Sequence, residues 1–203
     1  RDEGVFEKIS VSYTAQATNT LSYSPLDGAD ATTSFFEALF DAEAFRTATG
    51  QPSRFDTRVE QTVPVQATYA VSRVNLALTP SLQYTEILAS RTTDRVFDPA
   101  TNTLSTEQVG GLATARTLTA SMTAATEFYG TFNLRAGPVD GVRHTVRPRA
   151  SLSYQPDYAR FFNQVREVQA DSTGRTVRFA PVSGIPLEPT RTLSFGIENA
   201  VLA

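Results

Sequence analysis

Apolar and polar side chains alternate along this chain for unusually long stretches, and this pattern constrains the fold more than any other feature. In residues 5–23, apolar side chains hold mostly odd positions, and Ser, Thr, Gln and Lys hold the even ones. Successive side chains of a strand point to opposite faces of a sheet, so each such stretch predicts a strand with one apolar and one polar face. Six stretches have this pattern: residues 5–23, 57–71, 74–88, 112–136, 142–155 and 190–202.

The length of these stretches favours a membrane setting. Residues 112–136 keep one parity throughout, so we interpret them as a single strand. Ordinary strands average ~5–6 residues, whereas a tilted membrane-spanning strand needs ~9–11. We therefore expect strands that cross a bilayer and project beyond it. No apolar run approaches the ~18 residues that a membrane helix needs.

The connections alternate in length, which favours the same interpretation. About thirty residues separate the first two strands, followed by connections of about two, more than twenty, about five and more than thirty residues. Membrane barrels have short periplasmic turns and longer extracellular loops. The sequence predicts an all-β fold, an antiparallel transmembrane β-barrel fragment with long extracellular loops and short periplasmic turns. A soluble β-sandwich binding domain is the alternative.

Six strands are fewer than the 8 of the smallest single-chain membrane barrels. We therefore interpret residues 1–203 as part of one outer-membrane β-barrel domain, cut from a longer protein. Within the first long loop, Ser34 and Glu37 have capping-box spacing before Phe36, Leu39, Phe40 and Ala44, which follow a helical period. Within the last, residues 160–169 and 175–180 flank a turn at 171–174, which suggests a hairpin.

Composition excludes several classes of function. The chain has no cysteine and one histidine, and its net charge is −3. Disulfide scaffolds and cysteine metal sites are excluded, and the charge argues against a nucleic-acid partner. A membrane-embedded hydrolase would need a nucleophile and an acid beside His144, and neither is evident. We expect no catalytic residue, no metal site, no cofactor and no enzymatic activity.

Three prolines, Pro64, Pro80 and Pro148, fall inside predicted strands, where each removes a hydrogen bond from the ladder. Weakened pairing would help a wall that flexes or opens. Bulges that shape the barrel are the alternative explanation, and the one we favour.

Residues 143–158 read R-H-T-V-R-P-R-A-S-L-S-Y-Q-P-D-Y. This stretch resembles the strand signature of the lipopolysaccharide-assembly outer-membrane proteins, the LptD (OstA) family, through His144, Pro148, Tyr154 and Pro156. Residues 193–199 are similar to the strand that follows the long loop in the Bacteroidetes-type branch of that family.

The resemblance implies a closed barrel in the cell outer membrane that inserts lipopolysaccharide into the outer leaflet. On this reading, the chain is a wall segment of that translocon and contacts lipopolysaccharide and the lipid bilayer. The resemblance also implies a plug lipoprotein (LptE-like) in the lumen. A periplasmic bridge protein (LptA-like) would dock on an N-terminal periplasmic domain, which is absent from this sequence. Another outer-membrane barrel, such as a porin or nutrient receptor, is the alternative.

Arg143, Arg147 and Arg149 fall on the polar face of the strand at 142–155, near the expected periplasmic entrance. A guanidinium group pairs bidentately with phosphate. The three arginines are therefore candidate lumen-facing contacts for the phosphates of the lipid or for the plug. The structural alternative is that they balance wall carboxylates such as Glu60 and Glu127.

Overall fold

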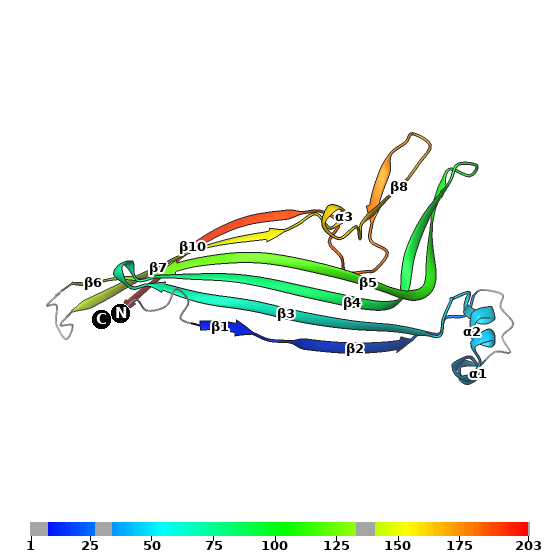
Figure 1. The fold of residues 1–203 in the computed structure, drawn as a ribbon, viewed down its shortest axis with the longest axis horizontal. Coiled ribbons are helices and arrows are strands. Elements are labelled where there is room, and N and C mark those ends of the chain that lie inside the picture. The colour runs from blue at the N-terminus through cyan, green and yellow to red at the C-terminus, as the bar shows by residue number, and fades with distance from the viewer. Residues whose placement is uncertain (1–7, 27–33, 133–140, 203) are drawn as a thin grey trace.

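The structure is a computed structural model that describes residues 8–26, 34–132 and 141–202. One antiparallel sheet dominates it (Figure 1). Its strands are β1 (Lys8–Val11), β2 (Thr14–Leu21), β3 (Phe55–Val71), β4 (Leu76–Asp98), β5 (Thr103–Thr126), β6 (Phe128–Phe132), β7 (Val142–Gln155) and β10 (Thr190–Leu202). β1 and β2 form one interrupted row beside β3, and β5 and β6 both pair with β7. Across the sheet, the order is β1/β2, β3, β4, β5/β6, β7, β10.

The all-β fold is confirmed, and the sheet stays open within the described residues. β7 and β10 coincide with the predicted strands at 142–155 and 190–202. The first predicted strand, 5–23, is shorter and divided into β1 and β2, and the second begins two residues earlier than predicted, at Phe55. Residues 5–7, 133–136 and most of the predicted turn at 137–141 lie outside the described residues.

The largest correction concerns residues 89–111, which we expected to form a loop. β4 and β5 instead continue as a hairpin and are paired from Leu76 with Thr126 to Asp98 with Thr103. The strand predicted at 74–88 therefore runs from 76 to 98, and the strand predicted at 112–136 begins at 103 and pauses at Glu127 before β6.

A β-bulge lies where this hairpin bends in Figure 1. Between the pairs Ala89–Ala113 and Arg91–Gly110, β4 has one residue and β5 has two, Gly111 and Leu112. An extra residue on one strand bends it and increases its twist. Gly111 has φ of 153°, a conformation that a residue with a Cβ rarely adopts.

Each of the three in-strand prolines lies opposite a gap in strand pairing. Pro64 faces the break between β1 and β2, where Ser12 donates to the Pro64 carbonyl at 3.2 Å and proline has no N–H to return. The β3–β4 pairing omits Ala67, opposite Pro80. The pairing of β7 with β5 and β6 stops at Thr126 and Glu127, opposite Pro148 and Arg147.

The long excursions of the chain share one end of the sheet, the loop end, and the short connections share the other, the turn end (Figure 1). At the turn end, the 3-10 helix η1 (Ser72–Val74) joins β3 to β4. At the loop end, the predicted helix is present as two: α1 (Phe35–Phe40), capped by Ser34, and α2 (Ala42–Thr49), capped by Asp41. No helix in the described part of the chain is long and apolar enough to span a membrane.

The connection from β7 to β10, which we call the cover loop (residues 156–189), contains the predicted hairpin. It holds α3 (Tyr158–Phe161), β8 (Arg166–Gln169) and β9 (Thr176–Phe179), and β8 pairs with β9. Tyr158, Val165, Val182 and Ile185 of this loop form a buried cluster with Ile87, Ala89 and Ala115 of the sheet. The alternation places these three sheet residues on the polar face, so the cover loop lies over that face at the loop end.

The opposite, apolar face is uncovered in the described residues. Exposed fractions there reach 86% for Phe195 and 67% for Leu193 and Ile197, and Leu152 and Met122 are also exposed. A soluble sandwich buries such side chains under a second sheet. The sheet here is a single layer, so the sandwich alternative is wrong.

Candidate functional site on the polar face

Arg147 stands between two carboxylates on neighbouring strands. Its Nε lies 3.1 Å from Glu127 Oε2, at the junction of β5 and β6, and its Nη1 lies 3.6 Å from Glu198 Oε1 on β10. Arg147 is the residue directly paired with Glu198, so register places these charges together. This geometry agrees with the alternative role for Arg147, that of balancing wall carboxylates. The two ion pairs link β7 to both of its neighbouring strands. Glu60 is balanced in the same way, by Arg58 at 3.4 Å.

Arg143 and Arg149 form no ion pair with the residues that the structure describes. The Arg143 guanidinium lies over the ring of Tyr129, 5.2 Å from its centroid. Arg149 borders two shallow hollows, each of about 250 Å³, which it shares with Arg147. Its partner on β10 is Gly196, and a Cβ at Gly196 would meet no atom within 4 Å. The Arg149 guanidinium therefore has no ion-pair partner among the described residues and has open space beside it.

Between this arginine cluster and the cover loop, the polar face is uncharged and lined by hydroxyl groups. Three cross-strand hydroxyl pairs follow the sheet: Thr62 with Thr85 at 3.1 Å, Ser81 with Ser121 at 2.6 Å, and Thr123 with Ser151 at 3.1 Å. Hydroxyl groups both donate and accept hydrogen bonds, so this zone suits water and sugar hydroxyls.

The cover loop is held together by Arg178. Its guanidinium lies 2.8 Å from Asp157 Oδ1 and 2.9 Å from Glu188 Oε2, joining the two ends of the loop. Two hydrogen bonds hold the pKa of the Asp157 carboxyl below its ordinary value. The larger effect comes from the Arg178 guanidinium and the smaller from the Ala159 N–H. The loop is also anchored to β3, because Arg58 Nη1 donates to the Ser183 carbonyl at 3.0 Å.

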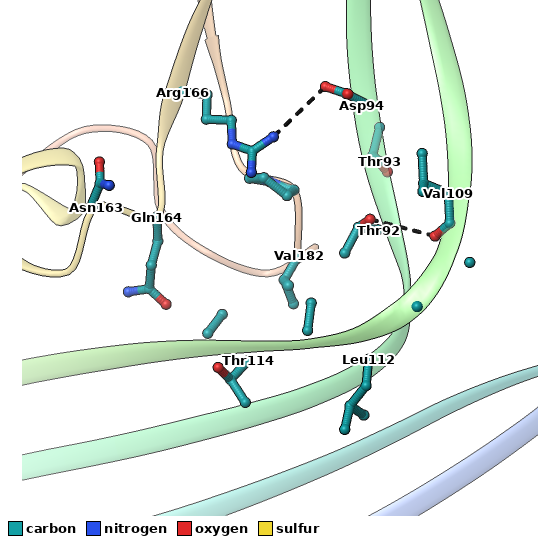
Figure 2. Close-up of a pocket in the computed structure, with 15 residues that line it drawn as sticks. Thr92, Thr93, Asp94, Val109, Leu112, Thr114, Asn163, Gln164, Arg166 and Val182 are labelled. Atoms are coloured by element: carbon teal, nitrogen blue, oxygen red, sulfur yellow. Dashed lines mark hydrogen bonds and ion pairs between the residues drawn. The ribbon is translucent and has the colours of Figure 1, made fainter.

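A cavity of about 420 Å³ lies between the cover loop and the bend of the β4–β5 hairpin. Figure 2 shows Arg166 reaching from the loop toward Asp94 of β4, with 4.0 Å between Nη1 and Oδ1. Thr92 and Thr93 lie on the hairpin side, and Gln164 lies on the loop side. The cavity is open and has a mixed polar and apolar lining, and none of these side chains forms a nucleophile–base pair.

The remaining candidate residues lie along β7 and its end. His144 pairs with Gly130 and Val201, and Pro148 with Ile197, on the apolar face. Tyr154 lies on the same face, and the Arg191 guanidinium carbon lies over its ring, 5.5 Å from the ring centroid. Pro156 is buried where β7 gives way to the cover loop. In the described ranges, no group of three or more His, Cys, Asp or Glu side chains is arranged to hold a metal ion.

The packing of the cover loop on the sheet and its Arg178 centre were not predicted. One signal was present: Ile87 and Ala89 interrupt a polar stripe on β4, which suggests that something apolar covers them. The contacts of Arg178 join residues up to 21 positions apart within an irregular loop, and no local pattern predicts such a fold.

Comparison with known families decides between the transport and porin interpretations. The family model described as LptD protein matches residues 1–203, the whole of the sequence. The chain belongs to the LptD family. LptD proteins are non-enzymatic outer-membrane proteins of lipopolysaccharide transport and assembly, so the porin, nutrient-receptor and hydrolase alternatives are set aside. The Bacteroidetes-type branch stays a prediction. No curated protein and no solved structure matches the chain.

Proposed function

We propose that this chain is a wall segment of the outer-membrane translocon that inserts lipopolysaccharide into the outer leaflet of the cell outer membrane. The observation that carries the proposal is a single-layer sheet with an uncovered apolar face and a hydroxyl-lined polar face. Such a sheet suits a wall between hydrocarbon and an aqueous passage.

Two zones of the polar face, the hydroxyl-lined zone and the arginine cluster, suit the sugars and the anionic groups of lipopolysaccharide. The hydroxyl zone offers hydrogen bonds to sugars, and Arg149, with open space beside it, is the candidate contact for an anionic group. An LptE-like plug that reaches the same surface is a second candidate partner for Arg143 and Arg149. An LptA-like bridge protein would act on a periplasmic domain outside residues 1–203.

Photo-crosslinking in cells that make the full-length protein tests the passage. A photoreactive residue at Thr119, on the polar face, should yield lipopolysaccharide adducts that disappear when lipopolysaccharide supply stops. The matched control is Thr101, at the tip of the β4–β5 hairpin, which should give none. Adducts at the outward residue Leu82 without any at Thr119 would contradict passage along this face.

Glutamine substitutions separate the arginine roles. Arg149→Gln should lower lipopolysaccharide export, or retention of the plug, while leaving thermal stability unchanged. Arg147→Gln should lower stability, because Glu127 and Glu198 lose their cation. Arg175→Gln, in the exposed hairpin of the cover loop, is the control and should change neither. Unchanged export and plug retention in Arg149→Gln would leave Arg149 as a structural charge.

A further inference from the structure

The apolar face does not extend uniformly along the strands. On β3, β4 and β5, it is apolar over Val63–Val71, Leu76–Tyr84 and Leu118–Thr126, apart from the terminal Thr126. These spans lie side by side, because Val63 pairs with Tyr84, Tyr84 with Leu118, and Leu76 with both Val71 and Thr126. Each span is nine residues long, and a tilted membrane strand needs ~9–11.

The next outward residue on each of these strands, toward the loop end, is polar. Gln61 pairs with Glu86, and Glu86 pairs with Arg116, so the three form a row across the sheet. Arg116 Nε lies 3.1 Å from Glu86 Oε1. We call Gln61, Glu86 and Arg116 the boundary row. A charge on the lipid-facing side of a barrel is destabilising in the hydrocarbon and is tolerated near the interface.

Aromatic side chains accompany this boundary. Tyr84 is the next outward residue after Glu86 on β4 toward the turn end. The Tyr13 hydroxyl donates to Gln61 Oε1 at 2.9 Å. On β7, Tyr154 stands under Arg191 in the ladder row of Ala120 and Leu82, two outward positions from the boundary row toward the turn end. Tyrosine rings with their hydroxyls turned to polar groups form the girdles of membrane barrels at the lipid–water interface.

From this arrangement, and resting on the function proposed above, we infer that the outer edge of the membrane hydrocarbon lies at the boundary row. The spans below it contact acyl chains, and the boundary row contacts lipid headgroups. The membrane is the occupant because the chain belongs to an outer-membrane family and the row continues the apolar surface directly. Arg116 also brings positive charge to the level of anionic headgroup phosphates.

Not every outward-facing apolar side chain then contacts acyl chains. Leu88, Leu112 and Phe55 are apolar and face outward, yet they lie on the loop side of the boundary row and stand outside the bilayer. A polar pair lies on the same side of the boundary row: Thr57 Oγ1 donates to Asn19 Oδ1 at 2.9 Å. The helices α1 and α2, the bent hairpin and the cover loop then project from the membrane surface.

Tryptophan scanning of the full-length protein in phosphatidylcholine vesicles tests this level. Leu82→Trp and Leu88→Trp form a matched pair on β4, on either side of Glu86. Emission is measured as the difference from wild-type protein, in vesicles with and without bromine on the acyl chains. Leu82→Trp should lose most of its emission to brominated lipid. Leu88→Trp should lose little to the lipid and be quenched by aqueous iodide. Leu112→Trp, at a side chain that is 79% exposed and therefore tolerant of replacement, should behave like Leu88→Trp.

Equal bromolipid quenching of Leu82→Trp and Leu88→Trp would overturn the boundary while leaving the membrane wall intact. A Leu88→Trp spectrum that neither bromolipid nor iodide quenches would overturn it as well and would point to a protein partner over this surface. Absence of bromolipid quenching at Leu82→Trp would instead remove the proposed wall function itself.

Discussion

The phenolic oxygen of Tyr158 accepts a hydrogen bond from the backbone N–H of Leu118 and donates one to the carbonyl of the same residue, each at 3.0 Å. Leu118 lies on β5 beyond the point where β7 ends, so its edge has no strand beside it. The side-chain amide of Gln164 pairs in the same way with the backbone N–H and carbonyl of Arg116. Two side chains of the cover loop thus satisfy an edge that would otherwise be open to pairing with another strand.

Tyr158→Phe tests this closure. The substitution keeps the buried ring but removes both hydrogen bonds, and a buried backbone group without a partner costs about 1–3 kcal/mol. We expect the Leu118 amide to exchange its hydrogen faster in the full-length protein. Tyr129→Phe, on an exposed ring of the same face, is the control. Unchanged exchange at Leu118 in Tyr158→Phe would show that the edge is protected by other means.

Acidification should loosen the cover loop through Asp157. Arg178 and the Ala159 N–H lower the pKa of this carboxyl in the fold from its ordinary value of 3.8. A lowered pKa contributes stability that is complete above the unfolded value and is lost as pH falls through the folded value. Limited proteolysis of the loop should therefore accelerate only below about pH 4. The cover loop of Asp157→Asn should be cleaved faster than that of wild type at neutral pH. Its cleavage rate should also rise less on acidification, because the contribution of Asp157 is gone. An Asp157→Asn loop as resistant as wild type at pH 7 would contradict this role.

The bulge at Gly111 gives a backbone prediction. Gly111→Ala places a Cβ on a residue with φ of 153°, where open space does not relieve the backbone strain. We expect destabilisation on the order of 1 kcal/mol or more and a lower melting temperature of the full-length protein in detergent. Gly196→Ala also meets open space, without positive φ, and should be neutral or slightly stabilising. Equal melting temperatures for Gly111→Ala and Gly196→Ala would argue against a strained bend.

Strands and their faces were predictable where one face meets a different medium from the other. β7 and β10 matched the prediction because apolar residues keep one parity over most of 142–155 and 190–202. The hairpin at 89–111 was missed because its residues are mostly polar and its apolar ones, such as Val96 and Phe97, fall on opposite faces. This is expected where a strand stands clear of lipid and needs no apolar stripe. The break at Asp41, which ends α1 and caps α2, was also missed, because the Phe36 to Ala44 spacing continues through it.

The candidate site was predictable in part. Arg147 and Glu127 share the polar parity, so their pairing could be anticipated from sequence as an alternative role. The contact with Glu198 depends on the register between β7 and β10, which a loop of more than thirty residues leaves undefined. The cover loop depends on long-range contacts such as Tyr158 with Leu118, which no local pattern encodes.

Pro148→Ala tests whether proline causes the gap between β5 and β6. Alanine supplies the missing N–H, so the amide at position 148 and those of Thr126 and Glu127 should gain protection from hydrogen exchange. Pro156→Ala, beyond the end of β7, is the control and should leave these amides unchanged. A persistent gap in Pro148→Ala would assign it to the Arg147–Glu127 ion pair or to strand curvature instead.

The division of the sheet into a lipid face and an aqueous face is the central claim, and alternating cysteines test it most directly. Single cysteines from Leu78 to Tyr84 on β4, in full-length protein reconstituted into vesicles, would be treated with a water-soluble thiol reagent. Positions 79, 81 and 83 should react readily, and positions 78, 82 and 84 should react slowly, with a period of two. Uniform reactivity along the segment would contradict a membrane wall with one face in lipid and one in water.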